Sequence, residues 1–172
     1  MVFLAEVVPR IFYNFFPMIT PASGRCFFIF KPMETCTFKH TARIDVRYAE
    51  TDQMGIVHHA VYAVWFEQAR TEYFREAGAS YADMEAEGFS SPVLELNVQF
   101  KNPTHYGEFV DIETTMVRVD RLRVRFLYKA TVNGKLCTTG STLHCMLKNG
   151  RPTRELPSGF AKFKFVNEDA QA

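Results

Sequence analysis

The 172 residues of the chain are enough for one domain with a buried core, because 47% of them are hydrophobic and 23% are charged. This composition excludes a chain that stays disordered for lack of apolar residues. The net charge of +1 gives no broad basic surface, so nucleic acid and anionic membranes are not expected as partners. The four cysteines show neither a CxxC pair nor a metal-ligand spacing, so we expect free thiols in the reducing cytoplasm and no bound metal.

The first 32 residues differ in composition from the rest of the chain. They contain eight aromatic residues but only four charged ones. An uncharged stretch at residues 11–24 is too short to span a bilayer and contains Pro17 and Pro21, so no stable membrane insertion is expected. We therefore expect residues 1–32 to be an extension translated from a start upstream of the natural one, and residues 33–172 to be the domain. A targeting segment is the alternative.

The first regular pattern is a loose alternation of apolar and polar residues over residues 41–48, which predicts a half-buried strand. The period then becomes helical. Between residues 59 and 77 most apolar residues fall on one face, and Gly78 follows as a helix stop. Ser80 is the expected N-cap of a second, short helix over residues 80–87.

The rest of the chain alternates as strands do. Asn133-Gly134 is a dipeptide preferred in tight hairpin turns, so the strands before and after it are expected to pair. The predicted strands are residues 93–101, 109–119, 123–132 and 136–147, with a short last one at 160–166. One strand, one long helix and a meander of four or five strands indicate an α+β fold, because a long helix with one apolar face needs a sheet to cover it.

Residues 51–62 contain the side chains most able to take part in a reaction. Asp52 lies in a Gly-containing turn, seven residues before the expected helix start at His59. Helix N-termini present unpaired N–H groups and partial positive charge, which can polarise a carbonyl in acyl transfer. A nearby carboxylate can attack the carbonyl carbon or activate water, so Asp52 and the His59 N–H could act as a pair. On local chemistry alone, capping the turn is the commoner role of such an aspartate.

This segment resembles a known active-site signature. The string Thr51-Asp52-x-x-Gly55-Ile56-Val57-x-His59-x-x-Tyr62, followed by Trp65-Phe66-Glu67-x-Ala69-Arg70, closely resembles that of the 4-hydroxybenzoyl-CoA thioesterase family. It is most similar to the bacterial acyl-CoA thioesterase branch, and the resemblance runs over residues 43–165. Seven ordered matches within twelve residues are specific, whereas a bare D-x-x-G would carry no weight.

The resemblance implies a hotdog fold, in which an antiparallel sheet of five to six strands wraps around one long central helix. It implies an acyl-CoA thioesterase that hydrolyses a short- to medium-chain fatty acyl-CoA, or an aromatic acyl-CoA, without a cofactor. Asp52 would act as nucleophile or general base, and the backbone N–H of His59 would polarise the thioester carbonyl. The expected substrate contacts are Gly55, Val57, His58, Val61, Tyr62 and Trp65.

One position departs from the family pattern. The branch usually has Asn where this chain has Val61, whose side chain cannot form a hydrogen bond. The departure bears on substrate range and rate more than on the type of reaction, because Asp52 is present. The side chain of His59 either orients the water or the aspartate, or it serves only the helix start. Tyr62 and Trp65 are expected to pack in the core or to form the wall of an acyl pocket.

The resemblance implies a dimer or a tetramer with active sites at the subunit interface. We therefore expect a homodimer or homotetramer that takes acyl-CoA as its substrate. The resemblance also implies that Lys or Arg meets the CoA phosphates. The candidates are Arg118, Arg121, Arg123 and Arg125, each of which could instead be a solvated residue of a strand edge. Glu95 could face the site from a neighbouring strand.

Two other functions are alternatives. A non-catalytic hotdog module would bind acyl-CoA or a protein partner, but such a module has no need of a carboxylate beside the thioester. A hotdog dehydratase would carry its acid in a different local pattern. The presence of Asp52 within the signature therefore favours hydrolysis.

Overall fold

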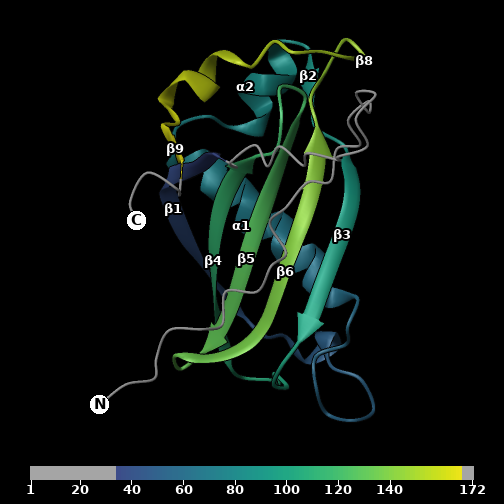
Figure 1. The fold of residues 1–172 in the computed structure, drawn as a ribbon. Coiled ribbons are helices and arrows are strands. Elements are labelled where there is room, and N and C mark those ends of the chain that lie inside the picture. The colour runs from purple at the N-terminus through teal and green to yellow at the C-terminus, as the bar shows by residue number, and fades with distance from the viewer. Residues whose placement is uncertain (1–33, 168–172) are drawn as a thin grey trace, which may run out of the picture.

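The computed structural model describes residues 34–167, so the predicted extension at residues 1–32 lies outside the described residues. The described part forms a curved antiparallel sheet in the strand order β3-β6-β5-β4-β1-β9. Helix α1 (Val61–Glu76) crosses the concave face of this sheet (Figure 1). The six strands are β1 Glu34–Asp45, β3 Val93–Phe100, β4 Phe109–Arg118, β5 Arg123–Val132, β6 Lys135–Cys145 and β9 Phe165–Asn167.

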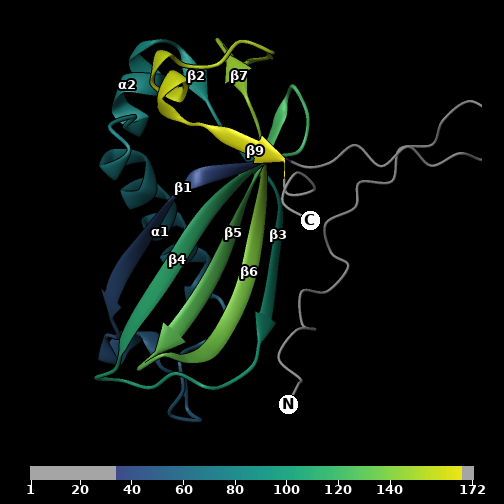
Figure 2. The ribbon, with the colours of Figure 1, turned by 60° about the vertical axis from the view of Figure 1, so that its left-hand side comes forward.

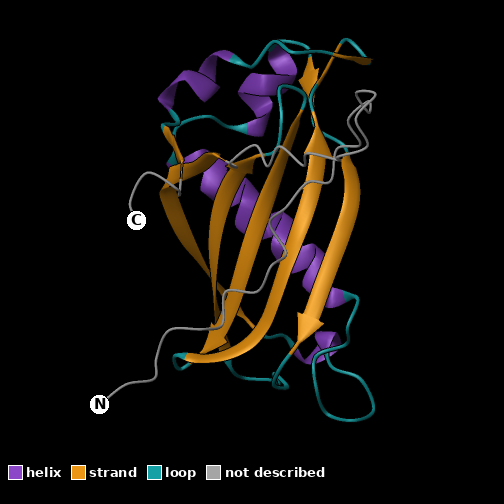
Figure 3. Ribbon diagram, viewed as in Figure 1, coloured by secondary structure: helices purple, strands orange, loops and turns teal. Residues whose placement is uncertain are grey.

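A group of short elements gathers at one end of the sheet, beyond the C-terminal end of α1 (Figures 1 and 3). Helix α2 lies on the same side of the sheet as α1 (Figure 2). A second, three-stranded sheet in the order β2-β7-β8 and a 3-10 turn, η2, complete the group. These elements are α2 Tyr81–Ala86, β2 Phe89–Ser90, β7 Leu147–Lys148, β8 Arg151–Pro152 and η2 Ser158–Lys162. The opposite end carries a single 3-10 turn, η1 (Tyr48–Glu50), and the loop that leads into α1.

The α+β arrangement predicted from the sequence is confirmed, and so are its main turns. The hairpin between β5 and β6 has positive φ angles at Asn133 and Gly134, as this kind of tight turn requires. Gly78 follows the end of α1 with a φ of +70°, a conformation that favours glycine. The Ser80 hydroxyl accepts a hydrogen bond from the Asp83 N–H at 3.2 Å and caps α2.

The predicted boundaries are wrong at several places. The first strand begins at Glu34 and not at residue 41, and β6 ends at Cys145 and not at residue 147. The first strand ends at Asp45, because the chain turns into η1 where the sequence predicted strand up to residue 48. Helix α1 begins at Val61 and not at residue 59. Residues 158–162 form η2, and only residues 165–167 pair as strand. Tertiary packing outweighs the alternating pattern there, because Phe160 and Phe163 turn inward against the ring of Phe74.

The core is the contact between α1 and the concave face of the sheet. Trp65, Phe66, Ala69 and Tyr73 recur at helical spacing and are at most 1% exposed. Each fully buried large apolar side chain stabilises the fold by about 1.5–3 kcal/mol. The Phe66 ring stacks on Tyr128 of β5 with a centroid distance of 4.3 Å and an interplanar angle of 5°.

A chain of polar side chains crosses this core and joins α1, α2 and the sheet. Arg70 of α1 donates from Nε to the Tyr81 hydroxyl of α2 at 2.7 Å and from Nη1 to the Tyr128 hydroxyl at 3.3 Å. The Tyr128 hydroxyl lies 2.8 Å from the Thr142 hydroxyl, which lies 2.9 Å from Nε2 of His144. Burial lowers the pKa of His144 to about 4, so its imidazole is neutral at pH 7. The buried guanidinium of Arg70 therefore donates its hydrogen bonds to neutral hydroxyl groups.

Gly140 of β6 provides the closest approach between α1 and the sheet. A Cβ atom at this position would overlap the edge of the Phe66 ring and would lie 2.9 Å from the carbonyl oxygen of Asn97. We expect Gly140→Ala to lower the free energy of unfolding by about 1–3 kcal/mol, because the stacked ring and the neighbouring strand cannot both move aside. Urea denaturation measures this loss. A double-mutant cycle with Phe66→Leu should show coupling, and additive losses would contradict the proposed overlap.

Candidate functional site

The loop of residues 51–60 connects η1 to α1 and lies at the end of the sheet below the C-terminal end of β3 (Figure 1). Its two arms run antiparallel. Thr51 and Val57 form an isolated bridge, and the Asp52 N–H donates to the carbonyl of Ile56 at 2.9 Å. The loop is fixed to the rest of the fold by the Val57 N–H, which donates to the carbonyl of Thr104 at 2.8 Å. These bonds fix the turn that carries Asp52 within the loop that leads into α1.

Asp52 caps the turn, as local chemistry suggested, but this role occupies only one oxygen of its carboxylate. Its Oδ1 accepts a hydrogen bond from the Met54 N–H at 2.8 Å, and its carbonyl accepts one from the Gly55 N–H at 2.9 Å. Gly55 has a φ of +74°, which a residue with a side chain rarely adopts. Within residues 34–167 the second carboxylate oxygen of Asp52 has no partner. The turn therefore fixes the carboxylate while one oxygen stays available.

The His59 N–H, just before α1, is an open backbone donor. Nδ1 of His58 accepts from the Ala60 N–H at 3.2 Å, and the His58 carbonyl accepts from the Val61 N–H at 3.0 Å. The N–H of His59 has no hydrogen-bond partner among the described residues, and His59 is exposed. This open donor lies at the positive end of the helix dipole, where it can bind a partly negative oxygen. Because Nδ1 of His58 accepts a bond, neutral His58 carries its proton on Nε2.

Glu50 anchors this loop, a role that was not predicted from the sequence. The side chain is only 6% exposed. Its carboxylate accepts hydrogen bonds from the Arg47 N–H at 2.9 Å, from Arg47 Nη2 at 2.7 Å and from Trp65 Nε1 at 3.2 Å. Its backbone carbonyl accepts from the His58 N–H at 2.9 Å. Glu50 therefore links η1, the loop and α1. The only signal in the sequence is the Arg-x-x-Glu spacing, which is too common to single it out.

The pKa of Glu50 reflects these contacts. Burial alone would raise it, but the hydrogen bonds from Arg47 and Trp65 outweigh burial and hold the pKa of this carboxyl below its ordinary value. Glu50 is consequently ionised at neutral pH, with its oxygens occupied by donors. Asp52, whose second oxygen is open, is the better placed of the two carboxylates for reaction.

Three predicted substrate contacts lie beneath the loop and not on its surface. Val57, Tyr62 and Trp65 are at most 4% exposed. The Tyr62 hydroxyl donates to the Thr104 hydroxyl at 3.3 Å, and its ring packs against Phe100 of β3 with a centroid distance of 5.2 Å. Gly55 and His58 are exposed, and Val61 is partly buried. The three buried side chains therefore support the loop that carries Asp52.

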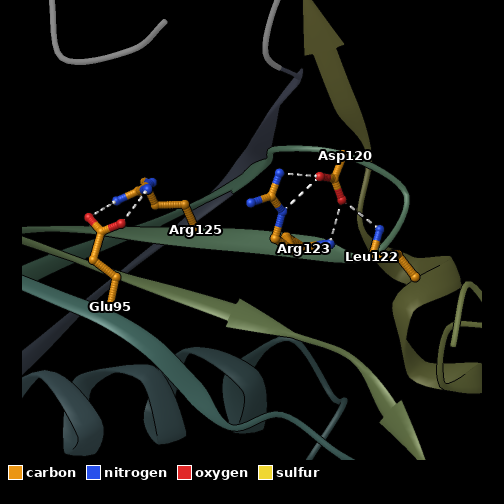
Figure 4. A network of polar contacts seen from close by, with 5 residues as sticks. All are labelled: Glu95, Asp120, Leu122, Arg123 and Arg125. Atoms are coloured by element: carbon orange, nitrogen blue, oxygen red, sulfur yellow. Dashed lines mark hydrogen bonds and ion pairs between the residues drawn. The ribbon is translucent and has the colours of Figure 1, made fainter. Parts of the chain in front are cut away.

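The predicted phosphate-binding arginines lie around the other end of the sheet, and most of them have carboxylate partners. Arg125 donates to the Glu95 carboxylate from Nη1 at 3.0 Å and from Nη2 at 3.3 Å (Figure 4). Arg123 bonds Asp120 at 2.6 Å, and Arg118 bonds Glu34 at 2.9 Å. Glu95 is opposite Leu143 in the strand register and lies on the face of the sheet that turns away from α1, so it does not face the Asp52 loop of this copy. Arg121 has no partner among the described residues.

Asp52 does not line the hollow below α2, the hollow beside the β4–β5 turn or the hollow beside Trp65. Residues 34–167 hold no cluster of three or more His, Cys, Asp or Glu side chains that could bind a metal ion. None of the helices in those residues is long and apolar enough to cross a membrane. Asp52 itself is partly buried.

The model of the Thioesterase-like superfamily matches residues 46–163 of the chain. The solved structure of a DHNA-CoA thioesterase from Staphylococcus aureus is 40% identical, superposes with a TM-score of 0.67, and the match covers 72% of this chain and 87% of that one. YneP of Bacillus subtilis (strain 168), named as a candidate acyl-CoA thioesterase, is 54% identical over 71 residues, which are 41% of this chain and only 51% of YneP. The acyl-CoA thioester hydrolase YbgC of Escherichia coli O6:H1 is 33% identical over 82 residues, 48% of this chain and 60% of YbgC. The match to the solved thioesterase confirms the hotdog fold.

We expect Glu50→Gln to lower the free energy of unfolding by about 1–3 kcal/mol at neutral pH, because the charged acceptor of the Arg47 and Trp65 bonds is lost. The Glu50 pKa is lowered in the folded state, so its contribution is present above the ordinary glutamate pKa of about 4.3 and disappears as the pH falls through the lowered value. The difference between wild type and variant should therefore shrink in acid.

Urea denaturation over a series of pH values from about 7 to about 3 measures this dependence. Glu85→Gln is the matched control, since Glu85 is exposed on α2 and its carboxylate has no partner among the described residues. It should change the free energy of unfolding by less than about 0.5 kcal/mol. A loss for Glu50→Gln that did not vary with pH would contradict the ionic role of Glu50.

Proposed function

This chain belongs to the Thioesterase-like superfamily, and we propose that it hydrolyses the thioester bond of acyl-CoA to a free acid and CoA. The observation that carries the proposal is the Asp52 carboxylate, which a turn holds with one oxygen open in the same loop as the unpaired His59 N–H. Relatives whose names describe thioester hydrolysis support it. A module that only bound acyl-CoA would have no use for an open carboxylate at this place.

The proposed reaction uses Asp52 and the start of α1. The His59 N–H binds the thioester carbonyl oxygen and stabilises the negative charge that develops there. Either Asp52 removes a proton from a water molecule that attacks the carbonyl carbon, or Asp52 attacks the carbon itself and water cleaves the resulting anhydride. In both routes a C–O bond forms, the C–S bond breaks, and the leaving thiolate takes up a proton.

The neighbouring residues have supporting roles in this proposal. Exposed His58 and Gly55 lie around the reacting group, and Val61 stands where the related branch usually has Asn. Buried Tyr62 and Trp65 form the wall below the loop. The His59 side chain can orient the attacking water from the exposed face of the loop.

We propose short- to medium-chain fatty acyl-CoA or aromatic acyl-CoA as the substrate. The aromatic option is supported by the solved Staphylococcus aureus relative, which is named for an aromatic acyl-CoA. Val61 replaces a polar side chain with an apolar one close to the site, which suits an apolar acyl group. No cofactor is required for the reaction as written.

A second copy of the chain is proposed to complete the site by pairing with β3. Among the described strands β3 pairs only with β6, so its other edge is unpaired. Val93, Leu94, Leu96 and Phe100 of this strand are between 46% and 54% exposed. A long apolar edge without Lys or Pro is a surface that favours pairing with another strand.

The proposed pairing places the second copy beside the catalytic loop. If β3 pairs antiparallel with itself, Phe100 of one copy approaches Val93 of the other. Phe100 packs on Tyr62, directly below the Asp52 loop. The second copy would therefore cover a site that is open in the single chain, in a homodimer or in a homotetramer built from two such dimers.

We expect Asp52→Asn to reduce thiol release from acyl-CoA by about 10²- to 10⁴-fold, because Asn can still accept the Met54 N–H bond but cannot take a proton or attack carbon. Thiol release from a series of acyl-CoA chain lengths and from benzoyl-CoA measures this loss. Asp45→Asn is the matched control, an exposed aspartate of β1. Full activity of the Asp52 variant would refute the role of Asp52, and no release by wild type would favour a binding module.

We expect Leu96→Lys to convert the oligomer into monomers and to reduce thiol release with it, because a charged side chain would be forced into the apolar pairing edge. Sedimentation velocity measures the change in mass. Val166→Lys on β9, at the opposite edge of the sheet, is the matched control and should leave the oligomer intact; Val166 is 46% exposed, as Leu96 is. A wild-type chain that is monomeric at the assay concentration would contradict the pairing.

A further inference from the structure

The hollow below α2 has a volume of about 340 Å³, which is in the range of sites for small organic molecules. Its walls come from α2, β2, the segment that leads into β3, and the start of β7. The floor is apolar, because Met84, Phe89 and Met146 are at most 4% exposed. Helix α1 spans about 24 Å between the Asp52 loop and the end of the sheet where this hollow lies (Figure 1).

The polar chain that crosses the core meets this hollow at both of its ends. At one end Tyr81, which lines the hollow, accepts a hydrogen bond from Arg70 Nε at 2.7 Å. At the other end the carbonyl oxygen of Ser91, which also lines the hollow, lies 3.0 Å from Nδ1 of His144. A ligand in the hollow would therefore lie against this chain of polar groups.

The direction of each bond in the chain follows from its Ser91 end. A carbonyl oxygen only accepts, so Nδ1 of the neutral His144 ring carries the proton and donates to Ser91. Nε2 of His144 then accepts from the Thr142 hydroxyl at 2.9 Å, and Thr142 accepts from the Tyr128 hydroxyl at 2.8 Å. Tyr128 has no second proton, so it accepts from Arg70 Nη1. The chain thus runs one way, from Arg70 to Ser91, and offers the guanidinium only neutral oxygens.

Hydrogen-bond donors exceed acceptors at the Arg70 end of the chain. A guanidinium has five N–H groups, and the bonds of Arg70 within residues 34–167 are those to Tyr81 and Tyr128. The Tyr81 hydroxyl accepts one of these bonds, and its own proton has no acceptor among the same residues. Arg70 is only 6% exposed, yet no described carboxylate pairs with it, and Glu67 one turn earlier on α1 is exposed. A buried cation without a counter-ion is costly, so this end favours an added anion.

The Arg70 guanidinium is still reachable from outside the core. In residues 34–167 the enclosed side-chain N and O atoms without a partner are the hydroxyl oxygens of Thr114 and Thr138. Nη2 of Arg70 has no partner there either and is not one of the enclosed atoms, so it keeps contact with solvent. An anionic group could reach it without opening the core.

We infer that the hollow below α2 binds an apolar molecule that carries a carboxylate, with the carboxylate at Tyr81 and Arg70 and the apolar body on the floor of the hollow. An ionised carboxylate only accepts hydrogen bonds, so it supplies what the Arg70 end lacks. Bonds from a guanidinium or a hydroxyl to such an anion are stronger than bonds between neutral groups. The charged residue of the lining, Glu85, is exposed, where water and salt screen its charge. A purely apolar ligand would leave the donors without acceptors.

Two sources could supply such a ligand. One is the acid that hydrolysis of acyl-CoA releases, and this source rests on the proposed function. Antiparallel pairing of β3 with itself would bring Pro92, which lines the hollow, next to Phe100 of the second copy and so near the Asp52 loop of that copy. The other source is an unrelated apolar acid that binds independently of hydrolysis.

The first experiment measures binding of octanoate and of octan-1-ol to the full chain by calorimetry at neutral pH. We expect Tyr81→Phe to weaken octanoate binding by about 10- to 100-fold, the loss that follows from removing a hydrogen bond to a charged group, and to leave octan-1-ol binding unchanged. Tyr106→Phe is the matched control, since Tyr106 is an exposed tyrosine that does not line the hollow. Equal octanoate affinities of wild type and Tyr81→Phe would overturn the inference, as would the absence of octanoate binding by wild type.

A second variant tests the place of binding without touching the polar chain. Ser90 is exposed on β2 and lines the hollow, so Ser90→Trp puts an indole ring over the floor. We expect this variant to lose octanoate binding while it keeps the far-UV circular dichroism of wild type. Octanoate binding that is unchanged in Ser90→Trp would place the acid elsewhere and overturn the inference.

Inhibition of thiol release distinguishes the two sources. If the ligand is the reaction product, octanoate competes with octanoyl-CoA, and Tyr81→Phe raises the inhibition constant by the same factor as the dissociation constant. If the ligand is a separate acid, octanoate binds without competing. Absence of thiol release from every acyl-CoA would refute the proposed function, whereas octanoate binding that depends on Tyr81 would leave the carboxylate site standing.

Discussion

The structure depends on one contact, the packing of the aromatic face of α1 against the concave face of the sheet. The Phe66 ring is stacked on Tyr128, and only the missing side chain of Gly140 lets the helix come this close. An interior packed to this density transmits changes in position, so the place of α1 determines the place of its N-terminus. The candidate site begins at that N-terminus. The sheet therefore positions the His59 N–H through the core, and not through contacts of the loop alone.

The loop itself depends on a buried charge. Glu50 is held by donors from Arg47 before it and from Trp65 on α1, so η1 and the helix share one anchor. A buried carboxylate is tolerated only when its oxygens are satisfied, and this requirement fixes the geometry of the turn that follows. Asp52, two residues further on, can then keep one oxygen open because the turn does not need it. Glu50 thus anchors the loop, whereas one oxygen of Asp52 stays without a partner among the described residues.

Local patterns in the sequence were sufficient for the α+β fold, the hairpin at Asn133-Gly134 and the Ser80 cap, because each depends on residues close together in the chain. The features that were missed depend on distant contacts. The Glu50–Trp65 bond spans 15 residues, and the Glu95–Arg125 pair requires the register of three strands. The strand predicted at 160–166 fails because Phe160 and Phe163 find aromatic partners on α1. Alternation cannot anticipate packing of that kind.

Charged side chains differ in how they are paired along the sheet. Along the strands, cations meet carboxylates: Lys39 with Glu113, Arg43 with Asp111 and Arg125 with Glu95. Other charged groups have no partner among the described residues, and these include the second oxygen of Asp52 and the guanidinium groups of Arg121, Arg151 and Arg154. Unpaired groups held on rigid elements cost little more to keep than paired surface charges, which are worth about 0–1 kcal/mol each. In the antiparallel pairing that we propose through β3, opposite ends of neighbouring copies would meet.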